Sequence, residues 1–149
     1  MRLPLLDAQS DTILSDHPKE LNKRSKIVLY STISAYTAGA TTLYFSWYKN
    51  YDQRSFHFFN DWQEWEQVDK LGHAYSTYAQ TYLLHEAFLW SGQSEKKALR
   101  NGAWIALGFQ TSIEIMDAFS TGWGFSLADM GFNLIGSGSY MLQENLWGQ

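Results

Sequence analysis

The sequence predicts an all-α protein, a compact membrane-associated bundle of about four or five helices. Its 149 residues match the length of one domain with a real core, and the chain shows no internal repeat. Acidic and amide side chains recur three or four positions apart inside apolar segments, the spacing of one helix face. Charged residues make up only 17% and aromatic residues another 17%, and contact with a membrane or a partner would explain so weakly hydrated a surface.

The composition excludes several classes of function. The formal net charge is −4 and the pI is near 5.5, whereas a protein that binds nucleic acid presents a basic face. The sequence contains no cysteine, which excludes disulfides, thiolate metal sites and thiol catalysis within these residues. We therefore expect no nucleic-acid partner.

The first third of the chain divides into three segments. Residues 1–26 carry both prolines and many polar residues, so we expect an irregular N-terminal arm, followed by a single helical domain over 27–149. Ile27–Tyr48 has no charge, and at about 1.5 Å per residue it could cross ~30 Å of hydrocarbon. Its many hydroxyls make it a poor span, so a transmembrane helix and a buried helix both stay open. The aromatic connector Lys49–Gln67 suits either a membrane–water boundary or a loop that caps the core.

Two helices are expected next. The first covers Asp69–Trp90, and Gly92 supplies its C-terminal stop. Ser94 then opens a helix that continues to about Phe119. Small residues four positions apart on this helix form a stripe that lets another helix approach closely: Ala98, Gly102 and Ala106.

A glycine-punctuated turn, Ser120–Phe125, separates these helices from the last one, expected over about Leu127–Leu142. A glycine inside a helix costs roughly 1 kcal/mol relative to alanine. The last helix contains three, which predicts close packing or an approaching ligand at each: Gly131, Gly136 and Gly138.

Polar side chains at helical spacing form the candidate site. The pairs are Asp69 with His73, Glu114 with Asp117, and Asp129 with Asn133. Some have simple explanations, since Asp69 favours a helix N-terminus and Ser126 with Asp129 approaches a capping box. Glu114 lies mid-helix between isoleucines, and a buried carboxylate needs a partner or a raised pKa. Lys70 and His73 are the natural partners. We expect eight residues to converge on one site: Asp69, Lys70, His73, Glu114, Asp117, Ser126, Asp129 and Asn133.

Three uses of such a cluster stay open. Two acids and a histidine, namely Asp69, His73 and Glu114, could hold a divalent metal. A histidine beside a carboxylate could act as a general base. A fully hydrogen-bonded network could simply lock the helices together. No cofactor is specified by the sequence, and a divalent metal is compatible with it.

The motifs resemble those of a known family. Asp69–His73 (Asp-Lys-Leu-Gly-His) before an apolar helix is similar to the Asp-Lys-x-x-His signature of YfiM-like predicted lipoproteins. The acidic pair of Glu114–Ser120, the glycine-aromatic turn and Ser126–Met130 (Ser-Leu-Ala-Asp-Met) resemble a second signature of that family, which Asn133 continues. The order is also similar to the VanZ-like membrane proteins. The resemblance covers about residues 62–143.

The resemblance implies a bacterial cell-envelope protein of unassigned biochemistry, on the periplasmic side or at the outer membrane. We expect a structural or partner-binding role, with membrane lipid or another envelope protein as the partner. The alternative is a membrane-proximal, metal-dependent hydrolase or lipid-modifying enzyme that uses Asp69, His73 and Glu114. A small ligand held in a cleft beside the glycines is a third hypothesis. An enzyme needs the cluster at the wall of a pocket, whereas a lock needs it enclosed.

Overall fold

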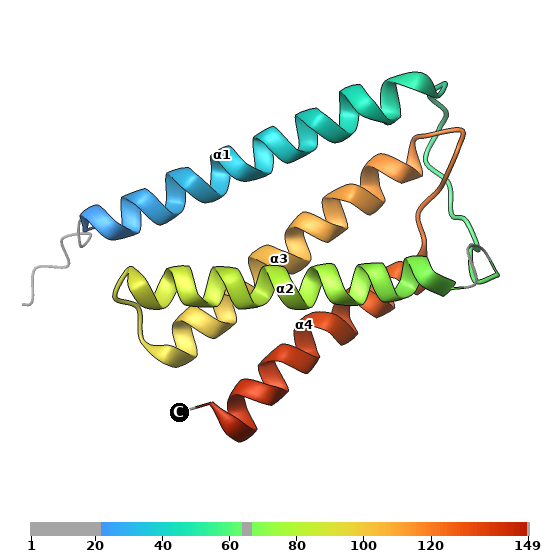
Figure 1. Ribbon diagram of the computed structural model, residues 1–149. Coiled ribbons are helices and arrows are strands. Elements are labelled where there is room, and N and C mark those ends of the chain that lie inside the picture. The colour runs from blue at the N-terminus through green and yellow to red at the C-terminus, as the bar shows by residue number, and fades with distance from the viewer. Residues whose placement is uncertain (1–21, 64–66, 149) are drawn as a thin grey trace, which may run out of the picture.

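The structure is a computed structural model that describes residues 22–63 and 67–148. Within these residues the chain forms four α-helices and one short 3₁₀ helix (Figure 1). Their bounds are α1 Lys23–Ser46, η1 Tyr48–Asn50, α2 Val68–Trp90, α3 Glu95–Ala118 and α4 Leu127–Trp147. The predicted all-α bundle is therefore confirmed. Most of the arm expected over residues 1–26 lies outside the described residues.

Helix α1 begins at Lys23, inside the segment that was expected to be irregular. The cause is a cap, because the Asn22 side chain accepts a hydrogen bond from the backbone N–H of Ser25 at 2.8 Å. The Asn22 amide also donates to the carbonyl of Ser91 at the end of α2, which fixes where the helix starts.

Helix α1 is mostly exposed and lies along the upper side of the molecule in Figure 1. Val28 is its one buried residue, so of the two alternatives left open for this segment the buried helix was wrong. Its main anchor to α3 is Tyr36, which stacks on Phe109 with 4.6 Å between ring centroids and donates a hydrogen bond to Ser112 Oγ. Among the described helices, none combines the length and the apolar character that crossing a membrane requires.

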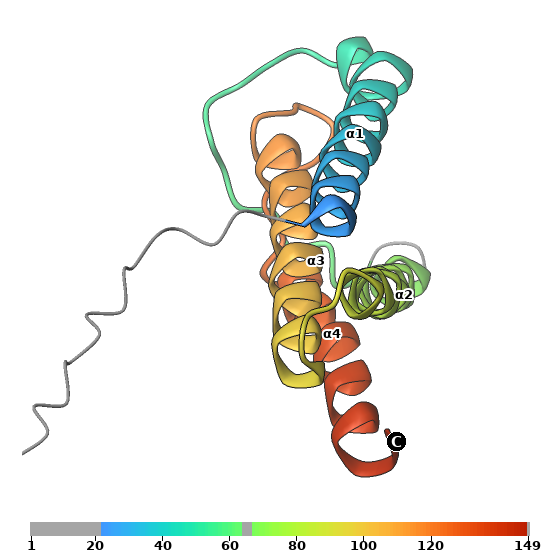
Figure 2. The ribbon, with the colours of Figure 1, turned by 90° about the vertical axis from the view of Figure 1, so that its left-hand side faces the viewer.

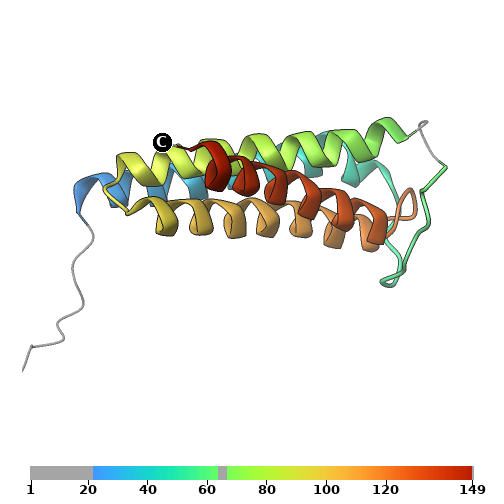
Figure 3. The ribbon, with the colours of Figure 1, turned by 90° about the horizontal axis from the view of Figure 1, so that it is seen from below.

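Helices α2, α3 and α4 pack directly on one another, as the views along and below the bundle show (Figures 2 and 3). Gly92 adopts a φ of +94° in the turn after α2, so the predicted stop is confirmed. The small-residue stripe of α3 is buried against α2, where a Cβ on Gly102 would lie 2.9 Å from the backbone nitrogen of His85. The two backbones therefore approach as closely as the stripe predicted.

Helix α4 continues to Trp147, five residues past its predicted end at Leu142. A Cβ on Gly136 would collide with the carbonyl of Ala74 in α2, so this glycine allows a close crossing. At Gly131 and Gly138 nothing lies within 4 Å of such a Cβ. The expectation of close packing is therefore confirmed at Gly136 and wrong at Gly131 and Gly138, which face open space.

The interior is unusually polar and the exterior unusually apolar. The largest fully buried side chains among the described residues are all polar or charged: Lys70, His85, Glu114, Asn133, Thr77, Thr81, Ser91, Ser120, Ser126 and Ser137. Large apolar side chains are instead exposed along α1, α2 and α4, with Tyr30 64% and Trp147 73% exposed. This distribution is the reverse of that in ordinary water-soluble domains.

Candidate functional site

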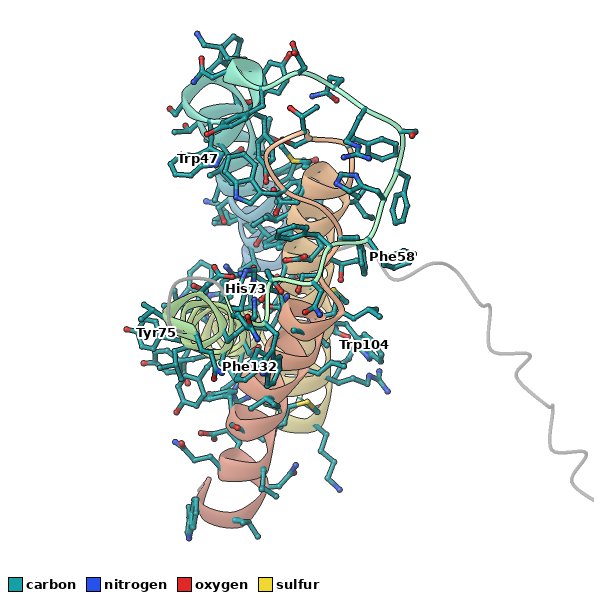
Figure 4. All side chains as sticks on the ribbon, turned by 90° about the vertical axis from the view of Figure 1, so that its right-hand side faces the viewer. Trp47, Phe58, His73, Tyr75, Trp104 and Phe132 are labelled. Carbon is teal, nitrogen blue, oxygen red and sulfur yellow. The ribbon has the colours of Figure 1, made fainter. Side chains whose placement is uncertain are left out.

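The candidate site is a cluster of polar side chains where the first turns of α2 and α4 meet the C-terminal half of α3. Figure 4 shows His73 on the side of α2 that faces the other helices, with Tyr75 on the outward side. The structure brings together all eight predicted residues and adds Asp61 from the connector. We call this set the polar cluster: Asp61, Asp69, Lys70, His73, Glu114, Asp117, Ser126, Asp129 and Asn133.

Lys70 is the cationic centre of the polar cluster and is 1% exposed. Its Nζ lies 2.5 Å from Asp61 Oδ2, 2.7 Å from Asp129 Oδ1 and 3.2 Å from Asp69 Oδ2. Burial alone would lower the pKa of Lys70, but the hydrogen bonds and charges of these carboxylates raise it above its usual value. Among the described residues Lys70 forms no ion pair with Glu114, so that expected pairing was wrong.

Asp61 is the member of the polar cluster that sequence reasoning missed. It accepts a hydrogen bond from the Ser126 hydroxyl at 2.8 Å, and that hydroxyl also accepts from the backbone N–H of Asp129 as the cap of α4. Burial alone would raise the pKa of Asp61, but its hydrogen bonds with Asp129, Lys70 and Ser126 lower that pKa. Asp61 lies in an irregular connector, where no helical spacing could mark it. The need of buried Lys70 for more than one counter-charge was the only available signal.

His73 is held from one side and faces carboxylates on the other. Its Nδ1 lies 3.2 Å from Asn133 Oδ1, and the Thr77 hydroxyl lies 2.9 Å from the same oxygen. Since an amide oxygen only accepts, Nδ1 carries the hydrogen in this arrangement. The other ring nitrogen, Nε2, is 3.7 Å from Asp69 Oδ1, 3.7 Å from Glu114 Oε1 and 3.8 Å from Asp129 Oδ2.

Glu114 is 1% exposed, and burial is the main cause that raises its pKa to about 8. The backbone N–H of Ser126 donates to Oε2 at 3.2 Å and opposes this rise, while neighbouring carboxylates add to it. The second oxygen, Oε1, accepts no hydrogen bond from the described residues. The predicted need of Glu114 for a raised pKa is therefore met.

Two further carboxyls of the polar cluster have raised pKa values. Burial raises the pKa of Asp117 to about 6 even though the Tyr48 hydroxyl donates to it at 2.6 Å. Burial and a hydrogen bond with Asp61 raise the pKa of Asp129 to about 6 against the effect of Lys70. Oδ1 of Asp129 accepts no well-directed hydrogen bond, yet the ammonium of Lys70 at 2.7 Å compensates its charge.

A pocket of about 450 Å³ opens onto one side of the polar cluster. Asp69, His73, Asp117 and Asp129 line its polar wall, while the rest is mostly aromatic and aliphatic. The apolar part comes from the end of α1, the connector, the start of α2 and the turn before α4: Leu43, Trp47, Phe59, Val68 and Trp123. The side chain of Asp69 is 43% exposed and that of His73 is 15% exposed, so the cluster is open at this wall and closed at Glu114.

Two groups of side chains in the described residues have the spacing of metal ligands. One is Asp69, His73 and Asp129, whose ligand atoms lie within 4.8 Å of one another; the other is His85, Glu95 and Glu144 at the far end of α2. Asp129 thus takes the place that the sequence hypothesis gave to Glu114, although Glu114 Oε1 is equally close to His73.

Residues 57–145, more than half of the chain, match the model of the family described as predicted periplasmic lipoprotein (DUF2279). The chain belongs to this family. The expected core of 62–143 lies within the match, which covers α2, α3, most of α4 and part of the connector. Its members are described by location and not by activity, so the protein is an envelope protein of uncharacterised function, associated with a membrane on the periplasmic side. Comparisons with curated proteins and with solved structures find no significant match.

Proposed function

We propose that this chain is a structural protein of the cell envelope that docks on a lipid membrane through α1. The observation that carries the proposal is the combination of exposure and neutrality on this helix. From Ile27 to the end of α1 the sequence has no charged residue, yet most of these residues are exposed, including Tyr30, Ile33 and Phe45. In water such a surface favours contact with another apolar medium.

The ends of α1 support lipid as that medium. Lys23, Arg24 and Lys26 are exposed at its start, where they can meet anionic headgroups. Exposed Tyr44, Phe45 and Trp47 lie at its other end, and aromatic rings of this kind favour the level of the headgroups. A membrane-associated location of the family agrees with this partner. The similarity of the motif order to YfiM-like lipoproteins and VanZ-like membrane proteins supports it too.

In this proposal the polar cluster holds α2, α3 and α4 together while α1 contacts the membrane. The buried ion pairs of Lys70 and the hydrogen bonds of Asn133 connect all three helices. The alternative of a metal-dependent hydrolase or lipid-modifying enzyme has no support among the comparisons, and we do not propose an activity.

Flotation with vesicles of phosphatidylethanolamine and phosphatidylglycerol tests the proposal. We expect the wild-type protein to float with the vesicles. Ile33→Glu and Phe45→Glu place a charge on exposed positions of α1, so they leave the bundle folded and should reduce flotation strongly. Lys96→Gln changes the net charge by the same amount at an exposed position of α3 and serves as the control. Equal flotation of all four proteins, or a wild type that stays with the soluble fraction, would contradict the proposal.

A further inference from the structure

Three carboxyl oxygens lie around one ring nitrogen inside the polar cluster. Nε2 of His73 is surrounded by Asp69 Oδ1, Glu114 Oε1 and Asp129 Oδ2, at 3.7 to 3.8 Å. These separations are too long for a hydrogen bond, so no proton bridges the ring to any of the three oxygens. Bringing such atoms together without a positive charge between them is electrostatically unfavourable.

Lys70 does not supply that charge. Its ammonium lies against Oδ1 of Asp129 and Oδ2 of Asp69. The opposite oxygens of the same two carboxylates, Oδ2 of Asp129 and Oδ1 of Asp69, are the ones that face His73. Each aspartate therefore has one oxygen on the lysine and one directed at the space beside Nε2.

Glu114 gives an independent indication that something occupies this space. Its side chain is 1% exposed, and Oε1 is buried without a hydrogen-bond partner in the described residues. This oxygen is directed at His73 Nε2, 3.7 Å away. An unsatisfied buried carboxyl oxygen is costly, and a bound ion that carries a water molecule is one of the few groups that would satisfy it.

We propose that Asp69, His73 and Asp129 form a structural binding site for one divalent cation of the zinc class, beside the buried carboxyl of Glu114. Such ions take carboxylate oxygens and imidazole nitrogens at about 2.0 to 2.2 Å, so ligand atoms between about 3 and 4 Å apart can share one ion. The three ligands come from α2 and α4, and the ion therefore joins these two helices where they meet α3. An imidazole among the ligands favours zinc over magnesium and calcium, which prefer oxygen alone.

The surroundings fit this role. Asn133 and Thr77 fix the ring of His73 from the Nδ1 side, which is how proteins usually orient a metal-ligating histidine. The pocket reaches Asp69, His73 and Asp129, so an ion can enter from the open wall. Three carboxylates lie against the single ammonium of Lys70 in the polar cluster, and a divalent charge reduces this imbalance: Asp61, Asp69 and Asp129.

The second group of potential ligands is a separate set at the other end of α2. His85 Nε2 lies 3.0 Å from Glu95 Oε1, within hydrogen-bond distance. Its Nδ1 is 2.9 Å from the Tyr140 hydroxyl. Nδ1 of His85 therefore has a hydrogen-bond partner, whereas Nε2 has an ion-pair contact with Glu95 but no aligned hydrogen bond. Glu95 lies outside the proposed site and serves as its control residue.

Calorimetric titration with Zn²⁺ tests the proposal on protein that has been treated with chelator and then freed of it. We expect the wild type to bind one ion per chain and to melt at a higher temperature with Zn²⁺ than without. Asp69→Asn changes a half-exposed side chain, so the fold is retained, and its affinity should fall by about tenfold or more. Glu95→Gln, which changes an exposed acid beside the other histidine, should leave the affinity unchanged.

Circular dichroism shows that each variant is folded before titration. Three outcomes would overturn the proposal: a wild type that binds no Zn²⁺, an Asp69→Asn variant that binds as tightly as the wild type, or a loss of binding confined to Glu95→Gln. The vesicle experiment concerns α1 alone, so its result and this one are independent.

Discussion

Replacement of Glu114 by glutamine should stabilise the metal-free protein at neutral pH and leave it almost unchanged in acid. Burial is the chief cause that raises the pKa of Glu114 from 4.5 to about 8. Because the folded-state pKa is the higher one, the stability contributed by this group is complete below pH 4.5 and is lost as the pH rises through 8. Glutamine does not titrate, and its amide oxygen can still accept from the Ser126 N–H.

The size of the effect follows from the pKa difference. At pH 7 the unfolded glutamate is ionised while the folded one is largely protonated, and this mismatch costs roughly 3 kcal/mol at about 1.4 kcal/mol per pKa unit. At pH 5 the same mismatch lowers the free energy of unfolding by less than about 1 kcal/mol. The Glu114→Gln gain in the free energy of unfolding should therefore grow by about 2 to 3 kcal/mol between these two pH values.

Urea denaturation at pH 5 and pH 7 in the presence of chelator measures this difference. Glu86→Gln is the matched control, since Glu86 is exposed on α2. Its replacement should change the free energy of unfolding by the same small amount at both pH values. A gain for Glu114→Gln that does not change with pH would refute the reasoning, because it would mean that Glu114 is ionised in the folded protein.

Two further predictions concern the contacts between helices. Lys70→Met removes the charge between Asp61 and Asp129 and should lower the free energy of unfolding at pH 7 by about 3 to 5 kcal/mol; a loss below about 1 kcal/mol in urea denaturation would contradict the assigned ion pairs. The glycines of α4 should respond in opposite directions to alanine. Gly138→Ala, in open space, should raise the melting temperature through about 1 kcal/mol of helix propensity, whereas Gly136→Ala should lower it, because a Cβ there meets a backbone carbonyl. Equal shifts of the two variants would show that α4 does not cross α2 at Gly136.

The sequence was sufficient to predict the end of α2 and the start of α4, because both depend on local chemistry. Gly92 stops α2 and Ser126 caps α4, and both act through their own backbone neighbours. The end of α4 was placed too early, and two of its glycines were given a packing role that they do not have, because a sequence does not show which face of a helix meets a neighbour. The exposure of α1 was missed for the same reason, since an uncharged run has one pattern whether it is buried or not.

The cluster could be predicted in part because buried charges must find partners. Helical spacing marked Asp69, His73 and Glu114, and the expectation that desolvated groups meet in space linked residues that lie far apart in the chain. Spacing could not rank the possible pairs. Lys70 was assigned to Glu114, but its carboxylate partners are Asp61, Asp69 and Asp129, a choice that depends on the crossing of three helices and on an irregular connector.

The two proposed roles use separable parts of the molecule. The family match begins at residue 57 and contains every residue of the polar cluster, whereas α1 ends at Ser46, before the match. The proposed ion joins α2 and α4 and takes no ligand from α1. Contact of α1 with lipid therefore requires no change in the cluster, and loss of the ion should loosen the packing of α2 on α4 without removing the apolar surface. Variants of α1 and of Asp69 should accordingly affect vesicle binding and Zn²⁺ affinity independently.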